Sequence, residues 1–137
     1  MEVILEIKKK NFYLRMFILP IYSSKICFVR FNDDNGYDQV IKFLRGVGVN
    51  CDSYEEDDYR NAYGFVVKEK TKYGNVQFIF MNACEEYKSE YVNTLSHESY
   101  HLVQNICSYH GLEFYPTGDN EHIAYLTGAI YSELNKM

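Results

Sequence analysis

The sequence predicts an α+β fold, in which a mixed or mostly antiparallel sheet packs against one long helix and a C-terminal helix. Segments rich in β-branched and aromatic residues, bounded by turn residues, fill the first third of the chain and recur at residues 63–81. After Met81 the apolar residues recur at helical spacing instead. A run of strands followed by helices is typical of the α+β class.

The length and charge of the chain limit its organisation and its partners. A chain of 137 residues, 47% of them apolar, is expected to form one domain, residues 1–137, with a substantial core. The net charge is −5, which argues against nucleic acid as a partner because phosphate binding needs clustered Lys and Arg. The run Lys8–Lys10 is expected to be a turn between strands rather than a binding patch.

Cysteine spacing and hydropathy indicate an intracellular protein. The four cysteines are widely spaced and form no C-x-x-C pair, so neither a zinc ribbon nor a dithiol redox motif is predicted. The apolar segment Phe12–Tyr22 is interrupted by Arg15 and Pro20, is too short to span a bilayer and lacks a signal-peptide cleavage site. We therefore expect a cytoplasmic protein with reduced thiols and no membrane partner.

The first half of the chain predicts three strands and one helix. The first two strands flank the lysine turn as a hairpin, and turn residues end the third. The helix follows from apolar residues that share one helical face, and glycines end it. The expected strands are Glu2–Ile7, Phe12–Leu19 and Lys25–Phe31, and the expected helix is Tyr37–Val47.

The middle of the chain predicts a loop and a second hairpin. The acidic stretch Asp52–Asp58 is expected to be a solvated loop, because like charges repel one another. The strands Tyr63–Lys68 and Asn75–Met81 are joined by the polar connection Glu69–Gly74, which favours a hairpin.

Two helices are expected after the second hairpin. Helical spacing predicts one long helix from Ser89 to about Tyr109, terminated by Gly111. A last helix is expected from about Asp119 to Leu134, with Asp119 or Thr117 as its N-cap. Its expected buried face is Ile123, Leu126 or Thr127, Ile130 and Leu134.

The long helix carries the motif His97-Glu98-Ser99-Tyr100-His101. His97 and His101 lie one turn apart and share a face, so both imidazoles can bind one metal ion such as zinc. Glu98 would point beside the metal, where it can hold and deprotonate a metal-bound water. The alternative is that the two histidines are surface or core residues with no metal.

A catalytic zinc site needs a third protein ligand. The start of the last helix supplies Glu121 and His122, and nineteen residues separate His101 from Glu121. A turn around Gly111 would let the two helices pack as an antiparallel pair, which would bring these side chains towards the histidines. Neighbouring helical residues diverge by about 100°, so only one of the two can easily face the metal.

The spacing resembles a known group of enzymes. H-E-x-x-H, nineteen residues and a Glu preceded by Asn is the pattern of gluzincins, the thermolysin-like zinc metallopeptidases. LSHESYHLVQNI followed by DNEHIAYLTGAI is also similar to small zincin-like metallopeptidases often encoded by bacteriophages. The resemblance covers about residues 75–131 and implies a minimal zincin-like domain with one Zn²⁺ per chain. It implies His97, His101 and Glu121 as ligands and Glu98 as general base.

The resemblance implies a hydrolase that cleaves peptide bonds in a peptide or protein substrate. We expect the substrate to lie extended along a sheet edge, at the strand Asn75–Met81. The alternative is a weakly active or inactive zincin-like module that binds metal as an interaction or structural protein, for example a phage component. A phage-encoded protein would act in the host cytoplasm or the virion. Histidine and carboxylate ligands also accept divalent ions other than zinc.

The chain departs from the thermolysin-like pattern around the metal ligands. Those enzymes carry an Asp four residues after the second histidine, where this chain has Asn105, and another four residues after the glutamate ligand, where it has Tyr125. Asn105 can still accept a hydrogen bond from an imidazole. Candidate oxyanion stabilisers are Tyr125, His122, Tyr115 and Tyr100.

Overall fold

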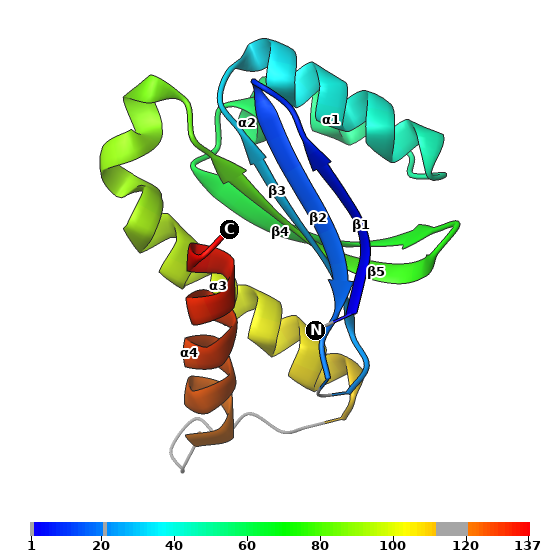
Figure 1. The fold of residues 1–137 in the computed structure, drawn as a ribbon, viewed down its shortest axis with the longest axis vertical. Helices are drawn as coiled ribbons and strands as arrows, with labels where there is room; N and C mark the ends of the chain where they lie inside the picture. Colours follow the sequence, from blue (N-terminus) through cyan, green and yellow to red (C-terminus); the bar gives the residue numbers. More distant parts are fainter. Residues whose placement is uncertain (1, 21, 112–120) are drawn as a thin grey trace.

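The computed structural model describes residues 2–20, 22–111 and 121–137, which form a five-stranded mixed sheet with four α-helices (Figure 1). This confirms the α+β class. Two 3₁₀ helices, η1 and η2, complete the regular structure. The elements in chain order are β1 (Glu2–Lys8), β2 (Phe12–Ile18), β3 (Lys25–Phe31), α1 (Asp34–Gly46), η1 (Asp52–Glu55), α2 (Asp57–Arg60), β4 (Gly64–Thr71), β5 (Gly74–Asn82), η2 (Glu85–Glu90), α3 (Tyr91–Tyr109) and α4 (Glu121–Asn135).

The sheet has the strand order β1-β2-β3-β5-β4, in which only β3 and β5 pair in parallel. Both predicted hairpins are confirmed. The first turns at the lysine run, where the Lys9 amide donates to the Phe12 carbonyl at 2.9 Å. The second is tighter than predicted, because Thr71 already pairs with Gly74.

The sheet separates two apolar layers, because successive side chains of a strand point to opposite faces. One face packs against α1, and α3 and α4 cover the other face (Figure 1). The layer under α1 includes Leu14, Val29, Phe78, Tyr37 and Leu44, and the layer under α3 and α4 includes Phe28, Ile79, Leu102, Val103 and Ile130.

The edge strand beside α3 is β4, so the predicted position of the substrate edge at Asn75–Met81 is wrong. That segment belongs to β5, which lies between β3 and β4. Its residues from Val76 onwards are buried on both faces, as a central strand requires. The exposed Lys68 and Lys70 mark β4 as the edge, because charged side chains are tolerated there.

The acidic stretch that follows α1 is not a simple loop. It forms η1 and α2, and it anchors Tyr54 in the core against Phe65. The Tyr54 hydroxyl donates to Glu69. The acidic side chains around it are exposed, so the prediction that the charges are solvated is confirmed. The prediction of a loop is wrong, because the backbone forms two short helices.

The last two helices lie together on one face of the sheet. α3 ends at the predicted residue, and η2 precedes it. α4 packs against α3 and returns towards the strands, where Arg30 donates to the Met137 carbonyl at 2.8 Å (Figure 1). Ile123, Ile130 and Leu134 are buried as predicted. The predicted N-caps Asp119 and Thr117 lie outside the described residues.

None of the described helices combines the length and the apolar character that crossing a membrane requires.

Candidate active site

The apolar side of α3 fixes the direction of its polar side chains. Leu95, Leu102 and Ile106 are buried against the sheet and α4, which is the helical spacing that predicted this helix. The two histidines flank this apolar stripe. The His97 side chain is 66% exposed, and His101 is half-buried.

The two imidazoles of α3 converge through the same ring nitrogen. The Nε2 atoms of His97 and His101 lie 3.0 Å apart, and the ring centroids are separated by 4.5 Å at an interplanar angle of 82°. Two nitrogens that bind one tetrahedral zinc at about 2.0–2.1 Å lie about 3.3 Å from each other. The spacing of the pair therefore fits two ligands of one ion.

The tautomer of His101 is set by Gln104. His101 Nδ1 lies 3.1 Å from Gln104 Oε1, and because an amide oxygen only accepts, Nδ1 carries the proton. Nε2 is then unprotonated. Its lone pair faces His97 Nε2 at 3.0 Å, where it accepts a hydrogen bond from His97 when no metal is bound. The Gln104 amide nitrogen is 3.4 Å from the Tyr100 hydroxyl.

Gln104, rather than Asn105, is the hydrogen-bond acceptor for the His101 imidazole. Asn105, which the resemblance to gluzincins suggested for this role, is exposed. The sequence contained a signal for it, because side chains three residues apart on a helix are neighbours. Tyr100 lies beside His101 and contacts this pair through Gln104.

Replacing Gln104 with Leu is expected to lower zinc affinity about tenfold or more, because the imidazole loses the acceptor that orients it. Isothermal titration calorimetry with zinc measures this. The matched control is Asn105→Ala, which is expected to leave the affinity unchanged. Equal losses in both variants would show that Gln104 does not orient the ligand.

Glu98 is the buried carboxylate of the site. Its side chain is only 10% exposed, and its Oε1 lies 4.0 Å from His97 Nε2. Burial raises the pKa of the Glu98 carboxyl, while positive charge on His97 and His101 would lower it. No hydrogen bond to this carboxylate occurs among the described residues, so it is poorly solvated and more basic than an exposed carboxylate.

Glu98 and His97 line a cleft of about 560 Å³ between the first half of α3 and the start of β4. Tyr63 and Gly64 form the strand side of this cleft, and Thr94 lies on the helix side. The cleft therefore joins the basic carboxylate to the edge strand of the sheet.

Gly64 allows α3 to approach the sheet closely. A Cβ at this position would lie 2.8 Å from Thr94 Cγ2, 2.9 Å from the Phe80 carbonyl oxygen and 3.3 Å from Glu98 Cγ. Any larger residue would therefore push α3 and Glu98 away from the strand.

Replacing Gly64 with Ala is expected to lower the free energy of unfolding by about 2 kcal/mol, because the added methyl overpacks this contact. Urea denaturation measures the change. The matched control is Gly128→Ala in α4, where an added Cβ meets nothing within 4 Å. That variant is expected to be more stable by up to about 1 kcal/mol, since Ala is the better helix former. If Gly64→Ala left the free energy of unfolding unchanged, that result would contradict the close packing of α3 against this strand.

The remaining predicted site residues are not gathered around the histidines. Glu121 is exposed at the start of α4, His122 is half-buried, and Tyr125 is 79% exposed. Within residues 2–20, 22–111 and 121–137, no three His, Cys, Asp or Glu side chains lie close enough to hold a metal together. The structure therefore brings together His97, Glu98 and His101, and the described residues place no third ligand beside the two histidines. Tyr115, a candidate oxyanion stabiliser, lies outside the described residues.

Cys107 is a further residue type that can bind metal, but it is buried in the layer between the sheet, α3 and α4. Burial raises the pKa of its thiol, which opposes formation of the thiolate that binds metal.

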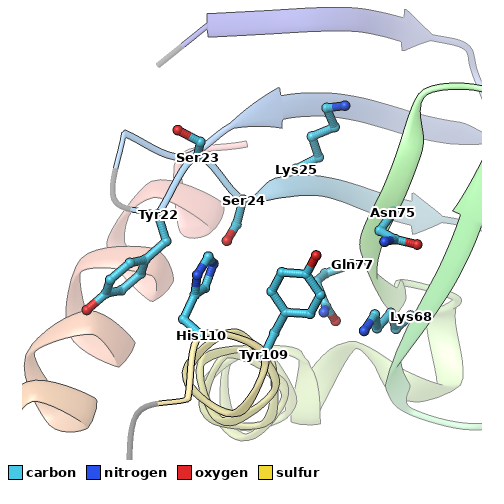
Figure 2. A pocket seen from close by; sticks show the side chains of 9 residues that line it. All are labelled: Tyr22, Ser23, Ser24, Lys25, Lys68, Asn75, Gln77, Tyr109 and His110. Atoms are coloured by element: carbon cyan, nitrogen blue, oxygen red, sulfur yellow. The ribbon is translucent and has the colours of Figure 1, made fainter.

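A second pocket lies at the C-terminal end of α3 and includes Tyr109 and His110 (Figure 2). It contains neither His97 nor Glu98, so it is separate from the cleft.

Comparisons of the chain with protein-family models, with curated proteins and with solved structures found no match.

Proposed function

We propose that this chain is a zinc-dependent peptidase with a minimal zincin-like fold. The observation that carries the proposal is the approach of the His97 and His101 Nε2 atoms to 3.0 Å beside the buried carboxylate of Glu98. The hydrogen bond between His101 and Gln104 adds support, because it presents the lone pair that a metal needs.

Glu121 is the proposed third ligand, and His122 is its competitor. Glu121 follows from the resemblance to gluzincins, and it begins the helix that packs against α3. A donor set of two imidazoles and one carboxylate would suit zinc. Because the described residues form no three-ligand group, the Glu121 side chain would have to move towards the histidine pair to complete this set.

The bound zinc and Glu98 would have different roles in peptide hydrolysis. Zinc, when bound by the histidines, supplies a Lewis acid that polarises the scissile carbonyl and acidifies water. Glu98 holds the attacking water, takes its proton and delivers that proton to the leaving amine. The burial that raises the pKa of Glu98 makes it a stronger base than an exposed carboxylate.

The open edge of β4 is the proposed substrate platform. The Asn82 amide donates to the Tyr63 carbonyl at 3.0 Å, so Tyr63 and every second residue after it pair with β5. The backbone groups of Gly64, Val66 and Lys68 then point outwards, where an extended peptide can add as a sixth strand. Such pairing depends little on the substrate sequence.

Peptide cleavage by the zinc-loaded protein tests the proposal. We expect a mixed peptide library to be cleaved by the parent and not by Glu98→Ala, with one zinc per chain in both. No cleavage by either protein, with stoichiometric zinc, would favour the alternative of a metal-binding interaction module. Elemental analysis that finds no bound metal after zinc loading would overturn both.

A further inference from the structure

The pocket at the C-terminal end of α3 has an aromatic wall (Figure 2). Its volume is about 290 Å³. Tyr22 stacks on His110 with ring centroids 4.7 Å apart, and His110 meets Tyr109 edge-on at 5.1 Å. The Tyr22 backbone is in the left-handed region, at φ 61°, which is costly for a residue other than glycine. The Tyr22–His110 stack therefore lines this pocket beside a turn of unfavourable backbone conformation.

The charged side chains that line this pocket are both cations. They are Lys25 and Lys68, and no carboxylate among the described residues lines the pocket. Lys25 donates to the Tyr73 carbonyl at 2.5 Å, and Lys68 Nζ lies 4.4 Å from the centre of the Tyr109 ring. Figure 2 shows the Lys25 side chain pointing away from Tyr109, whereas Lys68 Nζ lies beside that ring and retains its three donors for an anionic ligand.

A buried amide forms part of the same pocket. Gln77 is 7% exposed, and its Oε1 has no hydrogen-bond partner within the part of the chain that the structure describes. It lies on the face of β5 that otherwise carries Ile79 and Met81, where an apolar residue would be expected. An unsatisfied buried acceptor is unfavourable, and an N–H donor from a ligand would satisfy it. Figure 2 draws Gln77 behind the ring of Tyr109, which is 58% exposed, so a ligand that reaches Gln77 has to displace this ring.

β4 connects this pocket to the catalytic cleft. Gly64 lies against Glu98 near one end of α3, and Lys68 lies over Tyr109 at the other end. The histidine pair and Tyr109 are about 15 Å apart along the helix axis. An extended peptide covers that distance in about four or five residues.

We propose that this pocket binds the free C-terminal residue of a peptide. That residue carries a carboxylate for Lys68, a backbone N–H for Gln77 Oε1 and a side chain that can pack on the rings of Tyr109 and His110. The pocket alone supports binding of such a peptide. That the peptide is a substrate, cut about four or five residues before its end, rests on the proposed peptidase function.

Binding is tested on the full chain in the presence of a chelator, so that it does not depend on catalysis. The probe is an N-terminally labelled pentapeptide of four alanines and a C-terminal phenylalanine, as the free acid and as the amide, followed by fluorescence anisotropy. We expect the acid to bind about tenfold more tightly than the amide, because a charge-assisted hydrogen bond is lost. Lys68→Gln should remove this difference, while Lys70→Gln, a neighbouring cation outside the pocket, should keep it.

Equal binding of acid and amide by the parent protein would overturn the proposal. So would a difference that survives in Lys68→Gln, or displacement of the peptide by inorganic phosphate at equal concentration, which would indicate a general anion site. With zinc added, amidation should lower kcat/KM for longer peptides by a similar factor. If the acid is preferred but no peptide is cleaved, the peptidase proposal fails and the binding-site proposal stands. If peptides are cleaved but the acid is not preferred, the binding-site proposal fails and the peptidase proposal stands.

Discussion

Replacing Glu98 with Gln is expected to lower kcat for peptide hydrolysis about a thousandfold and, in the metal-free protein, to raise the melting temperature at neutral pH. The loss of activity follows because an amide cannot accept the proton of the attacking water. The gain in stability follows because the variant no longer buries a charge that has no hydrogen-bond partner among the described residues.

The pH dependence of that stability follows from the direction of the pKa shift. Burial raises the pKa of Glu98, so the folded state binds a proton more tightly than the unfolded state does. Below the unfolded pKa both states are protonated and the parent bears no penalty. As pH rises through the folded pKa, Glu98 becomes charged and the parent loses the stability that the neutral carboxyl gave it. The melting temperature of the parent should then fall below that of the variant.

Thermal melts with chelator, from pH 4 to pH 8, measure this separation. The control is Glu90→Gln, since Glu90 lines the same cleft and is exposed. That substitution is expected to change neither the activity nor the pH profile much. A variant at position 98 that melts below the parent at neutral pH would show that the carboxylate has a stabilising structural role.

Removing either histidine of the pair is expected to abolish stabilisation by zinc. At a zinc concentration of about one hundred times Kd, the parent should gain about 2.7 kcal/mol, which raises the melting temperature on the order of 10 °C. His97→Ala and His101→Ala should lose nearly all of this gain, because each removes a metal ligand. Differential scanning fluorimetry with and without zinc provides the measurement.

The control for this experiment is His110→Ala, at the end of α3 and away from the pair, which should keep the full zinc shift. Glu121→Gln is expected to lose most of the shift and His122→Ala to keep it. The opposite pattern would transfer the third-ligand role to His122. A shift that survives in both histidine-pair variants would place any zinc elsewhere on the chain.

The sequence determined the features that depend on local periodicity. The alternating strands and the span of α3 could be predicted because 2.0 and 3.6 residues per repeat leave a visible apolar pattern. The side-by-side placement of His97 and His101 required only that they lie on one helix. Gln104 could have been found in the same way, since it lies three residues after His101 on that helix.

Only the tertiary structure decided which strand borders the cleft, how deeply Glu98 is buried and what lies beside Gly64. β5 became a central strand because it pairs with β3, which is separated from it by α1, α2 and β4 along the chain. The basic carboxylate and its contact with Gly64 likewise arise where α3 meets an earlier hairpin. Such contacts join residues far apart in the chain, and no local repeat records them, because their positions follow from how the layers pack against each other.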